Sequence, residues 1–372
     1  MQNGDAAPPL SRVRHAVKRT LLSAGYYARR LAQLEFPGVA VLCYHSVRGD
    51  NDGPLPFNQL HVTRNTFEQH CQLIAAYCNP ISLADLRAAR SGARALPPRA
   101  VLVTFDDGYR AVLDLALPIL ERYNVPAVVF GCSGPIMRGT HFWFDSVYRS
   151  GGEGAVLDAR GAPAAAWMEL VNASQIPASS SESHRPLTVE ELKQLAASPL
   201  IAIGGHTLSH PTLALMPVEE QQREVEGCRR VLAQLVGSPI DAFAYPYGAS
   251  TRDYSPDTVS AVRRAGFDLG FTTAQTFAAV DCPAHEMFVV HCHAPFASRC
   301  QKGGTSFKKF CSGSRECLFR VVILRSGREA GKAEVPSASA GPEYKPVRRR
   351  GHSGVALGNA LITLPRRNTS AM

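Results

Sequence analysis

The stretch Val101-Leu102-Val103-Thr104-Phe105-Asp106-Asp107-Gly108 decides how the chain is interpreted. An apolar run ends abruptly there in two adjacent carboxylates and a glycine. This pattern is typical of a buried strand whose carboxyl end opens onto a functional loop, which is where parallel α/β folds usually carry their chemistry. The two neighbouring carboxylates therefore mark the first place to look for a functional site.

Strand-like apolar runs alternate with helical patterns on both sides of this stretch. Further strands are predicted at 39–45, 127–130, 200–203, 242–245, 269–273 and 288–291, and helices at 66–77, 83–89, 110–123, 189–197, 218–235 and 255–265. Such alternation favours an α/β fold, with a parallel sheet or barrel and helices outside it. Residues 131–186 interrupt the alternation, and we predict that they form an insertion with one or two helices.

The two ends of the chain differ from this middle part. Residues 10–34 have the spacing of a basic amphipathic helix, which we expect to pack on the domain with a solvated basic side. The alternative is contact with an anionic membrane face. Residues 299–372 show no period that would bury a core, so a disordered basic tail is predicted. The predicted domains are thus a basic helix over 1–35, a catalytic domain over 36–298 and the tail over 299–372.

Charge and targeting signals limit the partners and the location. The chain carries a net charge of +9, but 15 Lys and Arg against 4 Asp and Glu fall at 299–372, so residues 1–298 carry −2. The main domain therefore gives no reason to expect a nucleic-acid partner. The uncharged run at 20–28 is short and no A-x-A cleavage site follows it, which favours the cytoplasm, at the inner membrane face if the basic helix binds there. The sequence does not indicate an oligomeric state.

Ten cysteines show no C-x-x-C pair, and several lie in apolar segments, as Cys43 does. We expect reduced, buried thiols; a disulfide framework is the alternative.

Three polar clusters follow predicted strands: Asp106-Asp107, His206-Thr207-Leu208-Ser209-His210 and Tyr245-Pro246-Tyr247-Gly248. The carboxyl ends of parallel barrel strands converge on one face. A spacing of four places both imidazoles on one side of a helical turn or tight loop. Two imidazoles and one carboxylate form a common ligand set for a divalent metal with open positions. The alternative for these histidines is an ordinary surface or core position.

Two adjacent aspartates need not share a role, because consecutive side chains in a loop diverge. One can bind the metal while the other accepts a proton from a water whose pKa the metal lowers towards ~7. The alternative is an Asp-Asp-Gly turn that caps the next helix. Paired carboxylates for glycosidic cleavage fit poorly, because that chemistry separates them by at least ~5 Å across a sugar.

Three motifs together resemble a known family. Thr104-Phe105-Asp106-Asp107-Gly108, His206-Thr207-Leu208-Ser209-His210-Pro211 and Phe243-Ala244-Tyr245-Pro246-Tyr247-Gly248 are similar to the first three motifs of the polysaccharide deacetylases, which carry the NodB-homology domain of carbohydrate esterase family 4. Tyr44-His45-Ser46-Val47 resembles the first strand of many members. The resemblance spans residues 36–295, and the order and spacing of three motifs are far more specific than any one of them.

The resemblance implies a distorted (β/α)7 barrel with a divalent metal, most often zinc, held by Asp107, His206 and His210. It implies that the enzyme removes N-acetyl or O-acetyl groups from an amino-sugar polysaccharide or a lipid-linked glycan. Asp106 matches the family's catalytic base. The backbone N–H of Tyr247 matches the group that stabilises the oxyanion together with the metal.

The match has two departures. Ala244 stands where many members have an arginine that orients the base. The family's last motif supplies a general-acid histidine in a Leu-x-His pattern, which Val289-Val290-His291 fits only loosely, so that His291 matches it and His293 is the alternative. The segment can also align where members carry a non-catalytic arginine. Trp143 and Asp145 of the insertion are candidates for lining a glycan groove, unless the tryptophan simply covers the barrel edge. Two rival functions remain: hydrolysis of another non-peptide C–N bond on the same fold, and non-catalytic glycan binding.

Overall fold

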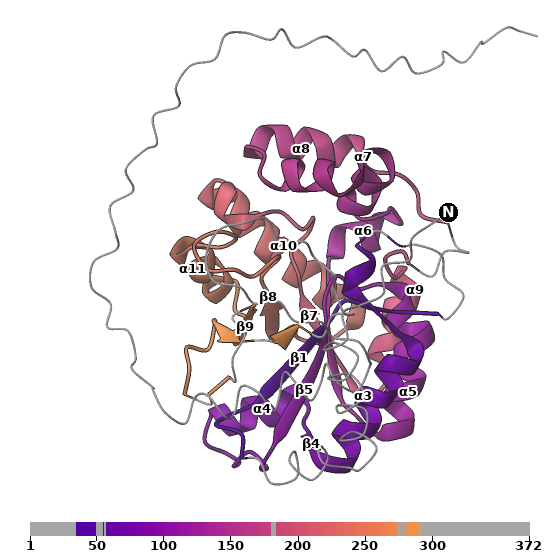
Figure 1. The fold of residues 1–372 in the computed structure, drawn as a ribbon. Helices are drawn as coiled ribbons and strands as arrows, with labels where there is room; N and C mark the ends of the chain where they lie inside the picture. Colours follow the sequence, from indigo (N-terminus) through magenta and orange to yellow (C-terminus); the bar gives the residue numbers. More distant parts are fainter. Residues whose placement is uncertain are drawn as a thin grey trace, which may run out of the picture. The chain divides into compact units, whose positions relative to one another are not determined.

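A curled sheet of parallel strands runs through the centre of the protein, seen in a computed structural model (Figure 1). The structure describes residues 35–49, 55, 57–179, 184–273, 278–279, 281–288 and 290–291. Within them the main sheet has nine strands, and eight follow the order β10-β9-β8-β7-β6-β5-β1-β11. Their bounds are β1 Ala40–Tyr44, β5 Ala100–Phe105, β6 Ala127–Gly131, β7 Ile201–Gly205, β8 Ala242–Ala244, β9 Leu269–Thr272, β10 Met287–Phe288 and β11 Val290–His291, with β4 (Asn79–Pro80) beside β5. The predicted α/β class is confirmed.

The sheet separates two apolar cores. On its outer side lie α3 (Arg64–Tyr77), α5 (Leu117–Tyr123), α9 (Val189–Ala196), α10 (Val218–Val236) and α11 (Pro256–Arg264), whereas α4 (Leu83–Arg90) packs against the other face. Side chains alternate along β5 because successive residues of a strand point to opposite faces. Val101, Val103 and Phe105 join the larger cluster, which includes residues of α3 and α5, whereas Leu102 joins the second cluster. The strand is thus buried on both faces, and its first polar side chains beyond Thr104 appear where it ends.

The predicted elements match closely in type, and the differences have local causes. The expected helix at 110–123 contains a π-helical stretch, Val112–Ala116, before α5. Three short strands were not predicted: β4, and β2 (Ser46–Arg48), which pairs in parallel with β3 (His61–Thr63). Each is two or three residues long, too short for the alternation that identifies a strand in a sequence. The single strand predicted at 288–291 is two strands, β10 and β11, which pair with β9 and β1.

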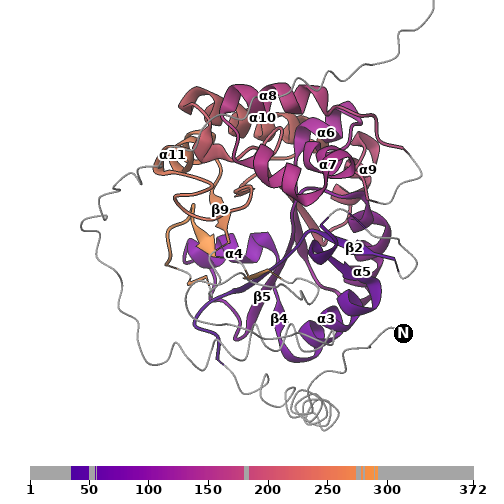
Figure 2. The same ribbon diagram turned by 45° about the horizontal axis from the view of Figure 1, so that its top comes forward.

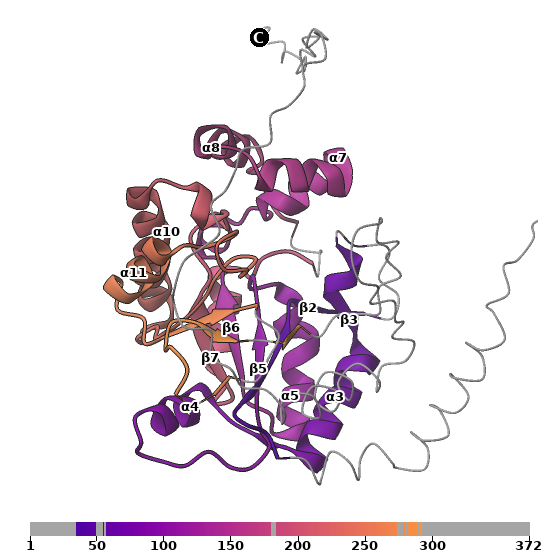
Figure 3. The same cartoon turned by 60° about the vertical axis from the view of Figure 1, so that its left-hand side comes forward.

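The insertion forms a helical layer at the carboxyl end of the sheet (Figures 2 and 3). It contains three helices, α6 (Ser133–Arg138), α7 (Trp143–Arg160) and α8 (Ala164–Ala173), where one or two were predicted. The additional helix is α6, which follows β6 almost directly. Helix α7 is interrupted at Gly152, whose φ of 72° lies in the left-handed region that glycine tolerates. Its two segments and α8 enclose an aromatic cluster with Phe142, Trp143 and Trp167.

Three further predictions concern the chain as a whole. The basic helix predicted over residues 1–35 and the tail predicted over 299–372 lie outside the described residues, apart from residue 35. Within the described part of the chain, no helix is both long and apolar enough to cross a membrane. The six described cysteines are free thiols and five are buried, in agreement with the prediction of reduced, buried cysteines.

Candidate active site

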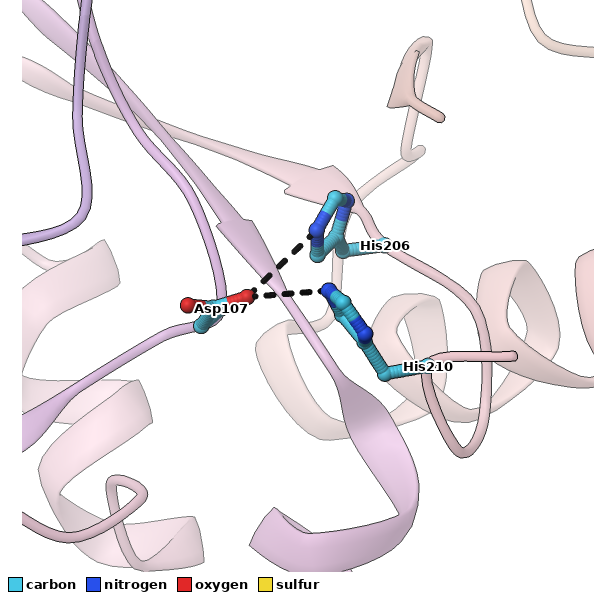
Figure 4. Close-up of side chains that lie close together, drawn as sticks. All are labelled: Asp107, His206 and His210. Atoms are coloured by element: carbon cyan, nitrogen blue, oxygen red, sulfur yellow. Dashed lines mark ion pairs between the residues drawn. The ribbon is translucent and has the colours of Figure 1, made fainter. Parts of the chain in front are cut away.

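Asp107, His206 and His210 meet at the carboxyl ends of β5 and β7 (Figure 4). Oδ1 of Asp107 lies 3.5 Å from Nε2 of His206 and 3.3 Å from Nε2 of His210. The three candidate ligand atoms all lie within 4.8 Å of one another, and all three residues are buried. The structure therefore brings together the three residues that the sequence predicted as metal ligands.

These distances fit a small divalent ion. Zinc binds imidazole nitrogen and carboxylate oxygen at about 2.0–2.1 Å in tetrahedral geometry, which separates neighbouring ligand atoms by roughly 3.3 Å. The carboxylate oxygen stands at about that distance from both nitrogens. A set of three protein ligands leaves a fourth position for water or substrate, as in catalytic rather than structural zinc sites.

The two histidines are positioned in different ways. Nδ1 of His206 lies 2.8 Å from the carbonyl oxygen of Ala244 on β8, to which it can donate, leaving Nε2 towards Asp107. Such a bond to the second ring nitrogen fixes the orientation of a ligand. His210 instead belongs to a tight loop in which its own N–H donates to Oγ1 of Thr207 at 2.8 Å.

Left-handed backbone conformations recur at the site. Asp107 has φ 72°, Thr207 φ 67° and His210 φ 63°, although none is glycine. Residues with side chains adopt this region only where the surrounding structure holds them there. Gly108 follows Asp107 with φ 89°, so the Asp-Asp-Gly sequence provides the sharp change of direction after β5.

Backbone hydrogen bonds join the start of the insertion to the loops that follow β5 and β7 and carry the candidate ligands. The N–H of Cys132 donates to the carbonyl of Asp107 at 2.9 Å. The N–H groups of Ser133 and Gly134 donate to the carbonyls of Thr207 and Leu208 at 3.1 and 2.7 Å. The end of β6 and the first turn of α6 thus link the loop after β5 to the loop after β7.

The two aspartates differ electrostatically. Burial alone would raise the pKa of Asp107, but the histidines facing it outweigh burial and hold that pKa well below its ordinary range. Burial raises the pKa of Asp106 to about 6, and the neighbouring Asp107 contributes in the same direction. Asp107 therefore stays ionised, as a candidate metal ligand must, while Asp106 is suited to accepting a proton near neutral pH.

Asp106 lies beside the ligand set rather than in it. Its Oδ2 is 3.3 Å from the thiol of Cys43 on β1. On the other side of β1 lies β11, where His291 is in register with Cys43. The predicted general-acid residue therefore belongs to the strand next to β1, while the alternative, His293, lies outside the described residues.

Tyr247 lies in the loop after β8, with φ 62°. Its ring stands edge-on to the ring of His210, with centroids 4.8 Å apart. The guanidinium of Arg160, at the end of α7, lies 3.8 Å from the centroid of the Tyr247 ring and pairs with Asp253 at 2.5 Å. Neither Cys43 nor Arg160 was predicted as a site residue, because no local pattern in the sequence brings either residue to the site.

The prediction that Trp143 and Asp145 line a glycan groove is wrong. Their exposed fractions are 4% and 2%, so neither offers a surface to a sugar. The indole N–H of Trp143 donates to the carbonyl of His210 at 3.1 Å. The hydroxyl of Tyr109, two residues after Asp107, donates to Asp145 at 3.3 Å. Trp143 therefore contacts a candidate ligand residue, and Asp145 contacts Tyr109, instead of lining an open groove.

A curled, half-barrel sheet of parallel strands with an Asp-His-His set at the carboxyl ends of its strands defines a class of α/β enzymes with a candidate metal centre. Residues 93–270 match the family model of the polysaccharide deacetylases, and this part of the chain is a polysaccharide deacetylase domain. Members of that family are hydrolases that act on carbon–nitrogen bonds other than peptide bonds.

Two relatives and one solved structure illustrate the similarity. The putative polysaccharide deacetylase YxkH of Bacillus subtilis (strain 168) is 23% identical over 254 residues, which are 68% of this chain and 69% of that protein. The poly-beta-1,6-N-acetyl-D-glucosamine N-deacetylase of Escherichia coli (strain K12) is 34% identical over 100 residues, 26% of this chain and 15% of that protein. The Streptococcus pyogenes deacetylase PplD, solved in complex with acetate, has the same fold, with a TM-score of 0.50, 19% identity and coverage of 68% of this chain and 92% of that chain.

Proposed function

We propose that this protein is a metal-dependent deacetylase that removes the N-acetyl or O-acetyl group of an amino sugar in a polysaccharide or lipid-linked glycan. One observation carries the proposal: the adjacent aspartates are divided between two environments. Asp107 faces two imidazole nitrogens, whereas Asp106 lies outside that set with a pKa raised to about 6. A ligand and a base one residue apart are what metal-assisted hydrolysis of an acetamide requires.

The ligand set favours zinc among the divalent metals. Two imidazoles and one carboxylate are a donor combination typical of catalytic zinc. When bound between Asp107, His206 and His210, the ion supplies a Lewis acid for a carbonyl oxygen and lowers the pKa of a water molecule. The burial of all three side chains keeps these charges away from bulk solvent, where their effect would be weaker.

The remaining steps are assigned to this chain's own residues. Asp106 takes a proton from the attacking water as the oxygen of that water bonds to the acetyl carbon. The backbone N–H of Tyr247 stabilises the negative charge on the acetyl oxygen. His291 gives a proton to the leaving nitrogen as the carbon–nitrogen bond breaks, so that acetate and a free amine are produced. For an O-acetyl substrate the leaving atom is the sugar oxygen.

Release of acetate from defined sugars tests the proposal. The panel should contain β-1,6-linked N-acetylglucosamine oligomers, oligomers of other linkages and O-acetylated sugars. The β-1,6-linked oligomers are included because the E. coli protein that matches part of this chain is named for that polymer. We expect zinc-loaded protein to release acetate from at least one member, with loss of turnover on chelation and in Asp106→Asn. Zinc-loaded protein that releases acetate from none of them would count against deacetylation and in favour of another C–N bond.

The location is a separate proposal. We propose that the chain works in the cytoplasm, and at the inner membrane face if residues 10–34, which have the spacing of a basic amphipathic helix, bind there instead of packing on the domain. Membrane binding predicts that full-length protein binds vesicles with anionic lipids at low salt and leaves them at high salt, whereas packing on the domain predicts no binding. Recovery of the protein outside the cytoplasm and its membrane face after cell fractionation would contradict this location.

A further inference from the structure

Helix α7 approaches the candidate metal site through its first turn. Phe142 precedes the helix, and Trp143 and Phe144 begin it. The indole N–H of Trp143 donates to the carbonyl of His210 at 3.1 Å, and the ring of Phe144 lies 5.0 Å from the ring of His210. Trp143 is 67 residues from His210 in sequence, so this contact depends on the folded insertion.

His210 needs such support more than His206 does. The ring of His206 is tied through Nδ1 to the carbonyl of Ala244. Nδ1 of His210 is buried and, among the described residues, has no hydrogen-bond partner. The backbone of His210 is left-handed, with φ 63°. Its placement therefore depends on its backbone bonds and on the aromatic rings packed around it.

We propose that helix α7 is part of the metal site, with Trp143 as a positioning residue that holds the strained backbone of His210 and thereby raises metal affinity. This inference rests on the proposed metal-dependent function. Residues that orient a ligand without touching the metal commonly change metal affinity by about 10–100-fold. The indole N–H is the only strong donor of the Trp143 side chain, so its removal isolates the effect.

The chain contains a matched control. Its second tryptophan, Trp167 on α8, is also 4% exposed and packs edge-on against Trp143, with centroids 6.2 Å apart. The indole N–H of Trp167 is buried and has no hydrogen-bond partner among the described residues. Trp143→Phe and Trp167→Phe thus remove similar volumes from the same cluster, but only the first removes a hydrogen bond to a ligand residue.

Zinc affinity is measured by chelator competition on full-length protein, without any substrate. We expect Trp143→Phe to weaken zinc binding by about 10–100-fold, and Trp167→Phe to stay within about threefold of the wild type. Equal affinities for the two variants, or a larger loss in Trp167→Phe, would overturn the inference. Failure of the wild type itself to bind zinc would overturn both this inference and the proposed function.

A second measurement does not require Trp143→Phe to fold. Protein labelled with ¹⁵N-tryptophan gives two indole N–H resonances, and Trp167→Phe assigns them by removing one. Zinc should shift the Trp143 resonance, because its acceptor is a ligand residue, and should move the Trp167 resonance much less. A shift confined to Trp167, or no shift of Trp143 at saturating zinc, would contradict the inference even where acetate is released.

Discussion

The thiol of Cys43 lies 3.3 Å from Oδ2 of Asp106. Many relatives are expected to orient this base with an arginine at the position that Ala244 holds here. In this structure the backbone carbonyl of Ala244 accepts from His206, and a neutral thiol contacts the base. A thiol stabilises a carboxylate less than a guanidinium does, which agrees with the raised pKa of Asp106.

Replacing Cys43 tests whether this contact matters for turnover. Cys43→Ala removes the donor, and the contribution of a single neutral hydrogen bond predicts a loss in kcat/KM of roughly 2- to 10-fold. Cys43→Ser keeps a donor and should retain more activity than Cys43→Ala. Steady-state acetate release measures both. Equal losses in the two variants would show that side-chain volume, rather than the hydrogen bond, is what the site requires.

The acidic limb of the pH profile should report Asp106. Burial raises its pKa to about 6, and the base must be ionised, so kcat/KM should fall as the pH drops through about 6. A bound cation favours the ionised carboxylate and would move the limb lower. Cys43→Ala should move it upward, because the thiol favours the charged form. An acidic limb that stays at the same pH in Cys43→Ala would argue against Asp106 as the base.

Mutation of Asp106 and mutation of Asp107 should affect turnover and zinc binding differently. Asp106→Asn should retain zinc and lose about 10²–10⁴-fold in kcat, the range that a general base contributes. Asp107→Asn should lose zinc, because the amide is a poorer ligand than the carboxylate that faces both histidines. Elemental analysis of the purified variants, together with acetate release, separates the two effects. Loss of zinc in Asp106→Asn would reverse the assignment.

Zinc should stabilise the folded protein. An ion that binds only the folded state at about 100 times its Kd adds roughly 2.7 kcal/mol to the free energy of unfolding, which raises Tm by about 5–10 °C for a domain of this size. Thermal melts with zinc and with chelator measure the difference. The same comparison in His206→Ala provides the control, since removal of one ligand should largely abolish the shift.

Acid should weaken the fold partly through Glu191. Hydrogen bonds from Arg185 lower the pKa of Glu191 from 4.5 to about 2, and both guanidinium contacts measure 2.8 Å. The stabilisation is complete above pH 4.5 and is lost as the pH falls through 2. Glu191→Gln should therefore be less stable than the wild type at pH 7, and the difference should shrink below pH 4. Urea denaturation at several pH values tests this; a constant difference would contradict it.

The sequence predicted well what depends on local pattern. The strand before Asp106 shows an apolar run with an abrupt polar end, and the four-residue spacing of His206 and His210 is visible directly. Both features act through a few neighbouring residues. The support around them could not be predicted in this way. Trp143 meets His210, and Arg160 meets Tyr247, only after the insertion has folded over the sheet. The same helical layer buries Trp143. The prediction that Trp143 lines a sugar-binding surface was wrong because the sequence does not show this burial.

The two last strands have a consequence for synthesis on the ribosome. β10 pairs with β9 at one end of the sheet path and β11 pairs with β1 at the other, although residues 287–291 contain both. The ribosome makes β1 first and synthesises roughly 250 further residues before β11, which takes about 12–50 s at ordinary translation rates. Until residue 291 leaves the exit tunnel, nascent chains expose one edge of β1. Exposed strand edges invite wrong pairing, so a chaperone that binds extended apolar segments should recognise this protein during translation rather than after its release.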